Sequence, residues 1–324
     1  MKHVFVINPH AGKGKAVETA TREIENYADI HPDFDYQIYV TRYPGDGQNF
    51  VKHLGDTTTE PVRIYACGGD GTLYEVANGA YGYKNIEIGA IPCGSGNDYI
   101  RLYGTPDQFQ NIAAQVEGKS AVVDVIKCGN RIALNQCSMG FDAETCNKQQ
   151  DFKKFKFLNA NASYLASILY CFLFKMDNNF TISLDDNDSE KYHVLFCYVG
   201  NSRWYGSGFM AAPFAMPDDG LLYVVVVRKN NDPKLKLLKL IKPYKEGRLI
   251  NHPITIFNRA KKVKIHSDMP ATVNIDGECE KRTDVEFEIV PKAMRFIVPT
   301  STTYFADRES GKISNEIDFS KFKF

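Results

Sequence analysis

The run from Gly68 to Thr72, with the sequence Gly-Gly-Asp-Gly-Thr, combines glycines and one carboxylate in the pattern of a phosphate-handling turn. Glycine permits a tight turn and lets main-chain N–H groups approach an anion closely. A carboxylate in such a turn repels phosphate unless a cation or a hydrogen-bond donor lies between them. We therefore interpret Asp70 as a position linked to magnesium, directly or through water.

Two more glycine turns lie in the same half of the chain. They occupy residues 8–15 and 92–98, and each follows a strand-like apolar run. One glycine-rich turn is weak evidence of a site, because a surface turn has the same composition, but three in series favour nucleotide binding. The first of them lacks the Gly-x4-Gly-Lys-Ser/Thr spacing, so it is not a Walker P-loop. Lys13 or Lys15, taken singly, fits an ordinary solvated charge better than a ligand contact.

Acidic turns in the second half of the chain carry the other candidate chemistry. Asp276-Gly277-Glu278 follows a strand-like stretch at 272–275. Positions two apart in an extended chain point the same way, so both carboxylates could face one cleft and accept a hydroxyl proton there. By composition alone the tripeptide fits a solvated turn better. Residues 218–220, Asp-Asp-Gly, likewise form a turn before a buried strand.

Strands and helices alternate around the glycine turns. The order predicts an α/β domain of three layers, with a largely parallel sheet covered by helices and the glycine turns beyond the carboxyl ends of its strands. Strands are expected at 3–7, 36–40, 62–67 and 86–91, and helical patterns at 16–27, from 45 and from 73.

From about residue 121 the pattern changes to short strands separated by turn signals, which predicts an antiparallel β-sandwich. Helical segments at 152–176 and 233–244 interrupt it. The expected domains are therefore 1–121 and 122–299, followed by a polar tail, 300–324, to which the sequence assigns no place. The strands are expected at 122–127, 131–137, 180–184, 192–200, 221–227, 263–267, 272–275 and 285–289.

The composition narrows the classes of protein to which the chain could belong. Lys and Arg number 39 and balance 39 Asp and Glu, so net charge predicts no nucleic-acid binding. No stretch is apolar enough to span a bilayer, and the N-terminal apolar run is too short for a secretory signal, so a cytoplasmic protein is expected. The 8 cysteines lack metal-type spacing, which predicts buried free thiols over disulfides or a zinc site.

Two segments suggest contact with lipid. Residues 228–264 contain twelve Lys or Arg and two acidic residues; this basic surface suits transient binding to an anionic leaflet, and a solvated helix face is the alternative. An apolar stripe in the second segment could line an acyl-chain pocket, although a core helix is the commoner meaning of such a stripe. The stripe consists of Phe152, Phe155, Phe157, Leu158, Tyr164, Leu165, Ile168, Leu169 and Phe172.

The three glycine turns, in their order, resemble the motifs of the diacylglycerol kinase catalytic domain. The resemblance extends through 200–222 and 276–278, covers nearly the whole chain to about residue 299, and is closest to the bacterial soluble diacylglycerol and lipid kinases, which are related to sphingosine kinases. Its motifs are specific for the family and not for the lipid. The chain departs from the family pattern at Ser95, which keeps the hydroxyl of the usual Thr, and at Tyr74, where Asn is frequent.

The resemblance implies an N-terminal α/β nucleotide domain and a C-terminal β-sandwich, with a lipid hydroxyl phosphorylated from ATP and magnesium in the cleft between them. The residues that would bind ATP are Asn8, Pro9, Gly12, Lys13, Thr41, Gly68, Gly69, Gly71, Thr72, Glu75, Gly94, Ser95, Asn97 and Asp98.

The catalytic residues implied by the resemblance are Glu278, Asp276 and Asp70. Either of the first two could be the base, with a lean towards Glu278. Similar bacterial enzymes also hold a structural magnesium through one carboxylate and two backbone carbonyls. The corresponding residues of this chain are Asp219, Met216 and Leu221.

We therefore expect an ATP- and magnesium-dependent lipid kinase that acts on diacylglycerol. An NAD-kinase-like enzyme shares the Gly-Gly-Asp-Gly turn but matches residues 73–79 and the 276–278 pair less well. A catalytically silent nucleotide-binding regulator is opposed by the intact acidic and glycine positions. The expected partners are the lipid substrate at a membrane surface, through transient peripheral contact, and a second copy of the chain in a homodimer.

Overall fold

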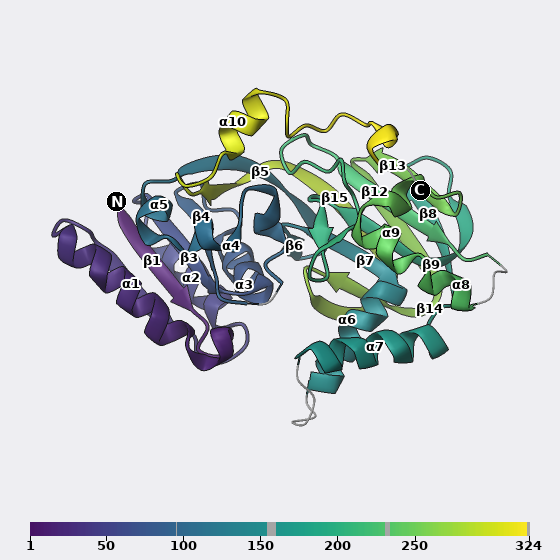
Figure 1. Ribbon diagram of the computed structural model, residues 1–324, viewed down its shortest axis with the longest axis horizontal. Helices are drawn as coiled ribbons and strands as arrows, with labels where there is room; N and C mark the ends of the chain where they lie inside the picture. Colours follow the sequence, from purple (N-terminus) through teal and green to yellow (C-terminus); the bar gives the residue numbers. More distant parts are fainter. Residues whose placement is uncertain (95, 154–159, 231–233, 323–324) are drawn as a thin grey trace. The chain divides into compact units, whose positions relative to one another are not determined.

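A computed structural model of the chain describes residues 1–94, 96–153, 160–230 and 234–322 (Figure 1). These residues form two compact units. Unit 1 contains residues 1–125 and 290–314, and unit 2 contains residues 126–289 and 315–324. Each unit therefore consists of two separate segments of the chain, and the C-terminal tail contributes to both units. The expected boundaries at 121 and 299 divide the chain into consecutive domains and do not include this return of the chain.

Unit 1 is built on a parallel sheet with the strand order β2-β1-β3-β4, and β4 pairs in parallel with β15 (Glu278–Val298) at Ile88 and Phe296. Strands β1, β3 and β4 are buried along most of their length, as expected for parallel strands covered on both faces, while the edge strand β2 is half-buried to exposed. They match the expected strands to within a residue or two. The four strands are β1 (Lys2–Ile7), β2 (Tyr36–Val40), β3 (Val62–Gly68) and β4 (Ile86–Pro92).

Helices cover both faces of this sheet, which confirms the predicted three-layer α/β arrangement. On one face, α1 (Ala16–Ile30) and α5 (Ile112–Val116) pack on the side of Phe5 and Ile7. On the other face lie α2 (Asp46–Thr57) and α3 (Asp70–Ala80), where Gly47 approaches Val6. The remaining helical segments of this unit are η1 (Ala11–Gly14), η2 (Tyr99–Leu102), α4 (Pro106–Gln110) and α10 (Tyr304–Glu309).

Unit 2 is an antiparallel β structure, as the sequence predicts. Its strands follow the order β13-β12-β9-β7-β14-β15, and β8 pairs with both β9 and β14. Strands β5 and β15 each have residues in both units. The strands are β5 (Lys119–Cys128), β6 (Arg131–Ala133), β7 (Gln136–Gly140), β8 (Asn178–Leu184), β9 (Glu190–Gly200), β10 (Trp204–Tyr205), β11 (Phe209–Met210), β12 (Leu222–Arg228), β13 (Thr255–Ala260), β14 (Lys262–Ile275) and β15 (Glu278–Val298).

Several expected elements of unit 2 differ in their bounds. The strand expected at 131–137 is two strands, those expected at 263–267 and 272–275 are one strand with a register shift between His266 and Ala271, and β13 was missed. The helix expected at 152–176 is wrong as a single element, because α6 already begins at Phe141. The helical segments are α6 (Phe141–Lys153), α7 (Ala160–Phe174), α8 (Lys234–Leu238), α9 (Ile241–Lys245), η3 (Arg248–Asn251) and η4 (Phe319–Phe322).

The apolar stripe expected in 152–172 is only partly a core face. Phe172 packs against the core of unit 2, whereas Leu169 is 58% exposed. Phe155, Phe157 and Leu158 lie outside the described residues. Across the described ranges, no helix combines the length and the apolar character needed to cross a bilayer.

Candidate active site

The three glycine turns of unit 1 meet where β1, β3 and β4 end. Asn8 donates from Nδ2 to Thr72 Oγ1 over 3.4 Å, which joins the first turn to the second. The Gly12 amide donates to the Cys93 carbonyl over 2.9 Å, and the Cys93 amide donates to the Gly68 carbonyl over 2.7 Å. The predicted gathering of the turns is therefore present in the structure.

Glycine is required at two of these positions by close packing. A Cβ on Gly68 would lie 2.1 Å from Thr72 Oγ1, and a Cβ on Gly94 would lie 2.6 Å from the Cα of Gly69. At Gly71, by contrast, an added Cβ would meet no atom within 4 Å. Gly71 thus faces open space in the first turn of α3, where main-chain N–H groups and the helix dipole favour an anion.

Asp70 joins the second turn to the third. Its carboxylate accepts the Asn97 amide at Oδ2 and the Asp98 amide at Oδ1, each over 2.8 Å. Burial raises the pKa of Asp70 to about 6, and repulsion from Asp98 adds to the increase, although the two N–H donors favour the ionised form. Asp70 therefore holds the loop around Gly96, where an added Cβ would lie 2.4 Å from its Oδ2.

Glu75 and Thr41 support the turns from α2 and the end of β2. Glu75 accepts the amides of Gly45 and Gly47 over 2.8 and 3.0 Å, which satisfies N–H groups at the start of α2. Thr41 donates from Oγ1 to the Ile7 carbonyl over 3.4 Å. Both side chains therefore bind main-chain groups next to the turns: Glu75 at the start of α2, and Thr41 at the end of β1. Tyr74, the departure from the family pattern, is buried within α3.

Other predicted nucleotide residues differ in exposure. Pro9 is half-buried beside Asn8, while Lys13 is exposed with a left-handed φ of 58°. Asp98 is buried and accepts Arg101 Nε at Oδ1 over 3.0 Å. Ser95 lies outside the described residues.

Arg101 is a neighbour of the site that sequence reasoning missed. Besides Asp98, it binds the Gly96 carbonyl through Nη2 over 3.0 Å, so it orders the same loop as Asp70. Its position three residues after Asp98 in η2 was the available signal, because residues three apart on a helical turn are neighbours.

In unit 2, Asp276 and Gly277 form the two-residue turn between β14 and β15. Their φ values are 47° and 99°, and Ile275 pairs with Glu278 across the turn. This conformation is typical of Asp-Gly in a tight hairpin. The expectation that Asp276 and Glu278 lie two apart along one strand is therefore wrong, since a hairpin turn separates them.

The Asp276 carboxylate is occupied by main-chain donors from the start of β7. It accepts the Leu134 amide over 2.6 Å, the Gln136 amide over 2.7 Å and the Asn135 amide over 3.2 Å. A carboxylate that accepts this many N–H donors is held in one orientation. The arrangement gives Asp276 a structural role in fixing the hairpin.

Glu278 differs from Asp276 in its exposure and in the contacts of its carboxylate. It is exposed at the first position of β15, and no hydrogen bond or ion pair within the described ranges engages its carboxylate. Of the two acidic residues, Glu278 therefore has the carboxylate that is accessible to an incoming hydroxyl group.

We expect Asp276→Asn to lower the free energy of unfolding by about 2–4 kcal/mol, because the amide group would oppose backbone N–H donors that the carboxylate now accepts. Thermal and urea unfolding would measure this loss, with Glu278→Gln as the matched control that keeps the wild-type stability. An Asp276→Asn protein of normal stability and abolished activity would instead make Asp276 catalytic.

The turn that contains Asp219 has hydrogen-bond donors around its carboxylate. Oδ1 accepts the Leu221 amide over 3.1 Å, and Oδ2 accepts the Tyr223 hydroxyl over 2.5 Å and the Asn315 amide group over 3.0 Å. Asn315 comes from the C-terminal tail, whose η4 also packs against Phe214 through its aromatic residues.

The Asp219 carboxylate is therefore held by hydrogen bonds from its own turn, from β12 and from the tail. Among the described residues, no group of three His, Cys, Asp or Glu side chains is placed to share a metal ion. The ligands implied at Met216 and Leu221 are backbone carbonyls, and the bonds at the Leu221 N–H group and the Met216 sulfur do not occupy them. Magnesium binding by Met216, Asp219 and Leu221 stays a prediction, and no step of the mechanism depends on it.

Asp219→Ala should destabilise unit 2 by about 2 kcal/mol, because the buried Tyr223 hydroxyl and the Asn315 amide would both lose their acceptor. Thermal unfolding without ATP, with and without added magnesium, separates the two roles. If magnesium raises the melting temperature of the wild type and not of the variant, Asp219 is a ligand. If magnesium raises the melting temperature of both proteins equally, Asp219 stabilises the turn through its hydrogen bonds alone.

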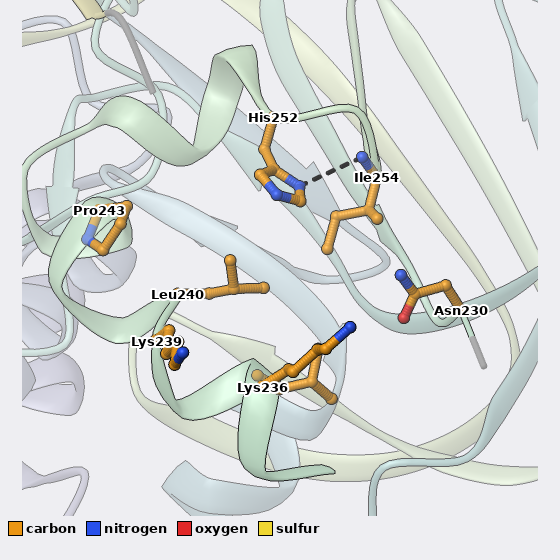
Figure 2. Close-up of a pocket in the computed structure, with 8 residues that line it drawn as sticks. Asn230, Lys236, Lys239, Leu240, Pro243, His252 and Ile254 are labelled. Atoms are coloured by element: carbon orange, nitrogen blue, oxygen red, sulfur yellow. Dashed lines mark hydrogen bonds between the residues drawn. The ribbon is translucent and has the colours of Figure 1, made fainter. Parts of the chain in front are cut away.

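A cavity of about 310 Å³ lies elsewhere in unit 2, between α8, α9 and the strand connection before β13 (Figure 2). Figure 2 shows His252 accepting the Ile254 amide, a bond of 3.3 Å. None of the predicted site residues lines this cavity. Its lining residues are Asn230, Lys236, Leu237, Lys239, Leu240, Pro243, His252 and Ile254.

Comparison with known families matches both halves of the chain. Residues 2–128 match the diacylglycerol kinase catalytic domain. Residues 135–298, more than half of the chain, match the YegS C-terminal NAD kinase beta sandwich-like domain.

Similar proteins match this chain over most of their length. The chain is 26% identical over 275 residues to the "Probable lipid kinase YegS-like" of Pseudomonas syringae, which covers 83% of this chain and 86% of that protein. It is 26% identical over 308 residues to the "Putative lipid kinase YtlR" of Bacillus subtilis, covering 90% and 97%. A crystal structure of a diacylglycerol kinase from Bacillus anthracis has the same fold, with a TM-score of 0.66, 20% identity and coverage of 93% and 97%. The chain therefore belongs to the family of the YegS C-terminal domain, joined here to a diacylglycerol kinase catalytic domain, and is a kinase-type phosphotransferase.

Proposed function

We propose that the protein is an ATP- and magnesium-dependent lipid kinase that converts diacylglycerol to phosphatidic acid. The observation that carries the proposal is the gathering of three glycine turns at the ends of β1, β3 and β4, with open space at Gly71 for an anionic group. The lipid acceptor is inferred from the names of the YegS-like and YtlR relatives, both of which are called lipid kinases.

In this proposal the turns of unit 1 bind the phosphates of ATP. The glycines allow close approach of main-chain N–H groups, and the first turn of α3 supplies a favourable dipole. Magnesium, when bound with ATP, neutralises charge that develops on the transferred phosphoryl group. The fit to magnesium rests on the Asp70 carboxylate, which lies within the second turn, and on the open space beside Gly71, where an added Cβ would meet no atom within 4 Å.

Glu278 is the proposed base. Its exposed carboxylate would accept the proton of the lipid hydroxyl while the hydroxyl oxygen bonds to the γ-phosphorus and the bond to ADP breaks. Asp276 would act as a positioning residue, because its three main-chain contacts fix the hairpin that presents Glu278.

We further propose that a surface of unit 2, made of α8 and α9, contacts anionic membranes. Leu238 and Ile241 are 42% and 43% exposed, and Lys239 and Lys242 are exposed beside them. Several cations of the basic segment are paired: Lys264 with Asp186, Arg248 with Glu246 and Lys229 with Asp177. Lys242 itself lies 4.0 Å from Glu246 and remains largely exposed. The membrane surface is therefore narrower than the whole segment 228–264.

Reversing two charges on this surface should weaken vesicle binding at least tenfold, since each basic residue near an anionic leaflet contributes about 1 kcal/mol. The test is sedimentation of Lys239→Glu/Lys242→Glu with phosphatidylglycerol vesicles at low salt. Lys119→Glu/Lys127→Glu is the control, because it changes two exposed lysines and the net charge equally. If vesicle binding weakens equally in both double variants, the effect comes from the net charge of the protein and not from the α8–α9 surface.

Acceptor identity tests the proposed function as a whole. The protein, γ-labelled ATP and magnesium would be incubated with dispersed diacylglycerol, other lipid alcohols and, separately, NAD. Label in phosphatidic acid supports the proposal. Label in NADP would assign an NAD-kinase-like function, and the absence of transfer to any acceptor, together with retained ATP binding, would assign a silent nucleotide-binding regulator.

A further inference from the structure

Two thiols flank the turn that presents Glu278. Cys146 lies on α6 and Cys279 is the second residue of β15, directly after Glu278. Both thiols point to the Gly277 carbonyl: the sulfur–oxygen distance is 3.4 Å for Cys146 and 4.0 Å for Cys279. The side chain of each is half-buried and unoxidised. The pair therefore sits on the hairpin itself and is partly accessible.

The two thiols also contact each other. Cys279 has Cys146 as a side-chain hydrogen-bond partner, and its sulfur lies 3.8 Å from the Ala143 carbonyl, one turn earlier on α6. The expected free thiols are present, and five of them are buried, while Cys93 and this pair are half-buried. Cys93 belongs to unit 1, so these two are the half-buried thiols of unit 2.

We propose that Cys146 and Cys279 form a modification site, a dithiol that low-molecular-weight disulfides convert reversibly to a disulfide bond. The Cys146 thiolate attacks one sulfur of the oxidant, a Cys146–sulfur bond forms, and the first small thiolate leaves. The Cys279 thiolate then attacks Cys146 and releases the second small thiolate. The two protein thiols lose two electrons and two protons, and the oxidant is reduced to two thiols.

The environment of Cys279 sets the order of these steps. Its hydrogen bond with Cys146, and then burial, raise the pKa of the Cys279 thiol above its ordinary value. Thiolates are the nucleophiles, so Cys279 reacts slowly with an external oxidant. Once Cys146 carries the small thiol, the hydrogen bond that raises the pKa of Cys279 most is lost, and the second attack becomes easier.

The bond should lower phosphoryl transfer, an effect that rests on the proposed role of Glu278. A disulfide brings two sulfurs to about 2.05 Å, closer than two thiols in contact. Because α6 is held to β14 by the bond from Thr272 to Glu144, the hairpin must move towards the helix. A displacement of about 1 Å at a reacting group can cost a hundredfold in rate, and we expect a loss of about tenfold to a hundredfold.

The experiment treats the full-length protein with oxidised glutathione and follows two readouts. Peptide mapping by mass spectrometry detects a crosslink between Cys146 and Cys279, and lipid phosphorylation is measured before and after dithiothreitol. Cys146→Ser and Cys279→Ser should each abolish the crosslink and the reversible loss of activity. Cys171→Ser is the matched control, because this buried thiol of α7 lies outside the pair and should leave both responses intact.

The readouts separate this inference from the proposed function. A crosslink in the wild type and in Cys171→Ser, with activity restored by reduction, supports the switch. A crosslink without any change in activity overturns the link to Glu278. Stable mixed disulfides or an unmodified pair after prolonged oxidation overturn the site itself, whatever the activity of the protein turns out to be.

Discussion

Glu278→Gln should lower the turnover of lipid phosphorylation by about a hundredfold to ten-thousandfold, the range over which a positioned general base contributes. Glutamine is close to glutamate in size and cannot accept the hydroxyl proton. Because no described residue binds the Glu278 carboxylate, the substitution should leave the melting temperature and the affinity for ATP unchanged. Steady-state turnover with diacylglycerol, thermal unfolding and nucleotide titration measure the three quantities.

Comparison with Asp276→Asn makes this result specific. Both variants remove one negative charge from the same hairpin, but only Asp276 is bound by main-chain amides. We expect Asp276→Asn to lose activity in proportion to its loss of stability. Glu278→Gln should lose activity while its stability stays at the wild-type value. Near-wild-type turnover of Glu278→Gln would remove Glu278 from the chemistry.

Asp70→Asn should reduce phosphoryl transfer by at least a hundredfold while most of the fold of unit 1 is kept. The variant loses the charge next to the proposed phosphate site and one of two acceptors for the amides of Asn97 and Asp98. Turnover at saturating magnesium, with circular dichroism as the check on folding, measures the effect. Near-normal turnover under these conditions would exclude Asp70 from the mechanism.

The pKa of Asp70 adds a pH dependence to the same prediction. With a pKa of about 6, the carboxylate is ionised at neutral pH and becomes protonated as the pH falls below about 6. The value of kcat/KM for ATP should therefore decrease on the acid side of pH 6. A profile that stays flat down to pH 5 would show that the ionised form of Asp70 is not needed.

The unit 1 fold was predictable because its signals are local. Strands β1, β3 and β4 are short apolar runs, and each is followed directly by a glycine turn. Parallel strands place those turns at one edge of the sheet. The bonds from the third turn to Asp70 could not be predicted from the sequence, because they depend on how the second and third turns pack against each other.

The different roles of Asp276 and Glu278 could not be predicted, because the distinguishing contacts are remote in sequence. The amides that bind Asp276 lie 140–142 residues away, in the connection between β6 and β7 and at the first residue of β7. Asn315, which binds Asp219, is likewise 96 residues from it, in a tail without a clear pattern. A turn composition shows that a carboxylate is present and says nothing about which distant donors reach it.

Helix α6 was missed for a different reason. Its sequence from Phe141 to Lys153 is largely polar and has little helical periodicity of apolar residues. Gly140, with a φ of 103°, ends β7 immediately before it. The apolar residues of α7 were therefore assigned to one longer helix, and the contact between α6 and the hairpin at Gly277 was not foreseen.

Single-turnover transfer from γ-labelled ATP to diacylglycerol, measured at saturating enzyme concentration for the wild type and Glu278→Gln, tests the central claim most directly. Enzyme in excess over labelled ATP removes product release from the measured rate. We expect the transfer step to be at least a hundredfold slower in the variant, with the same half-saturating ATP concentration in a separate nucleotide titration. An unchanged transfer rate at saturation with weakened ATP binding would contradict it and assign Glu278 to the nucleotide site.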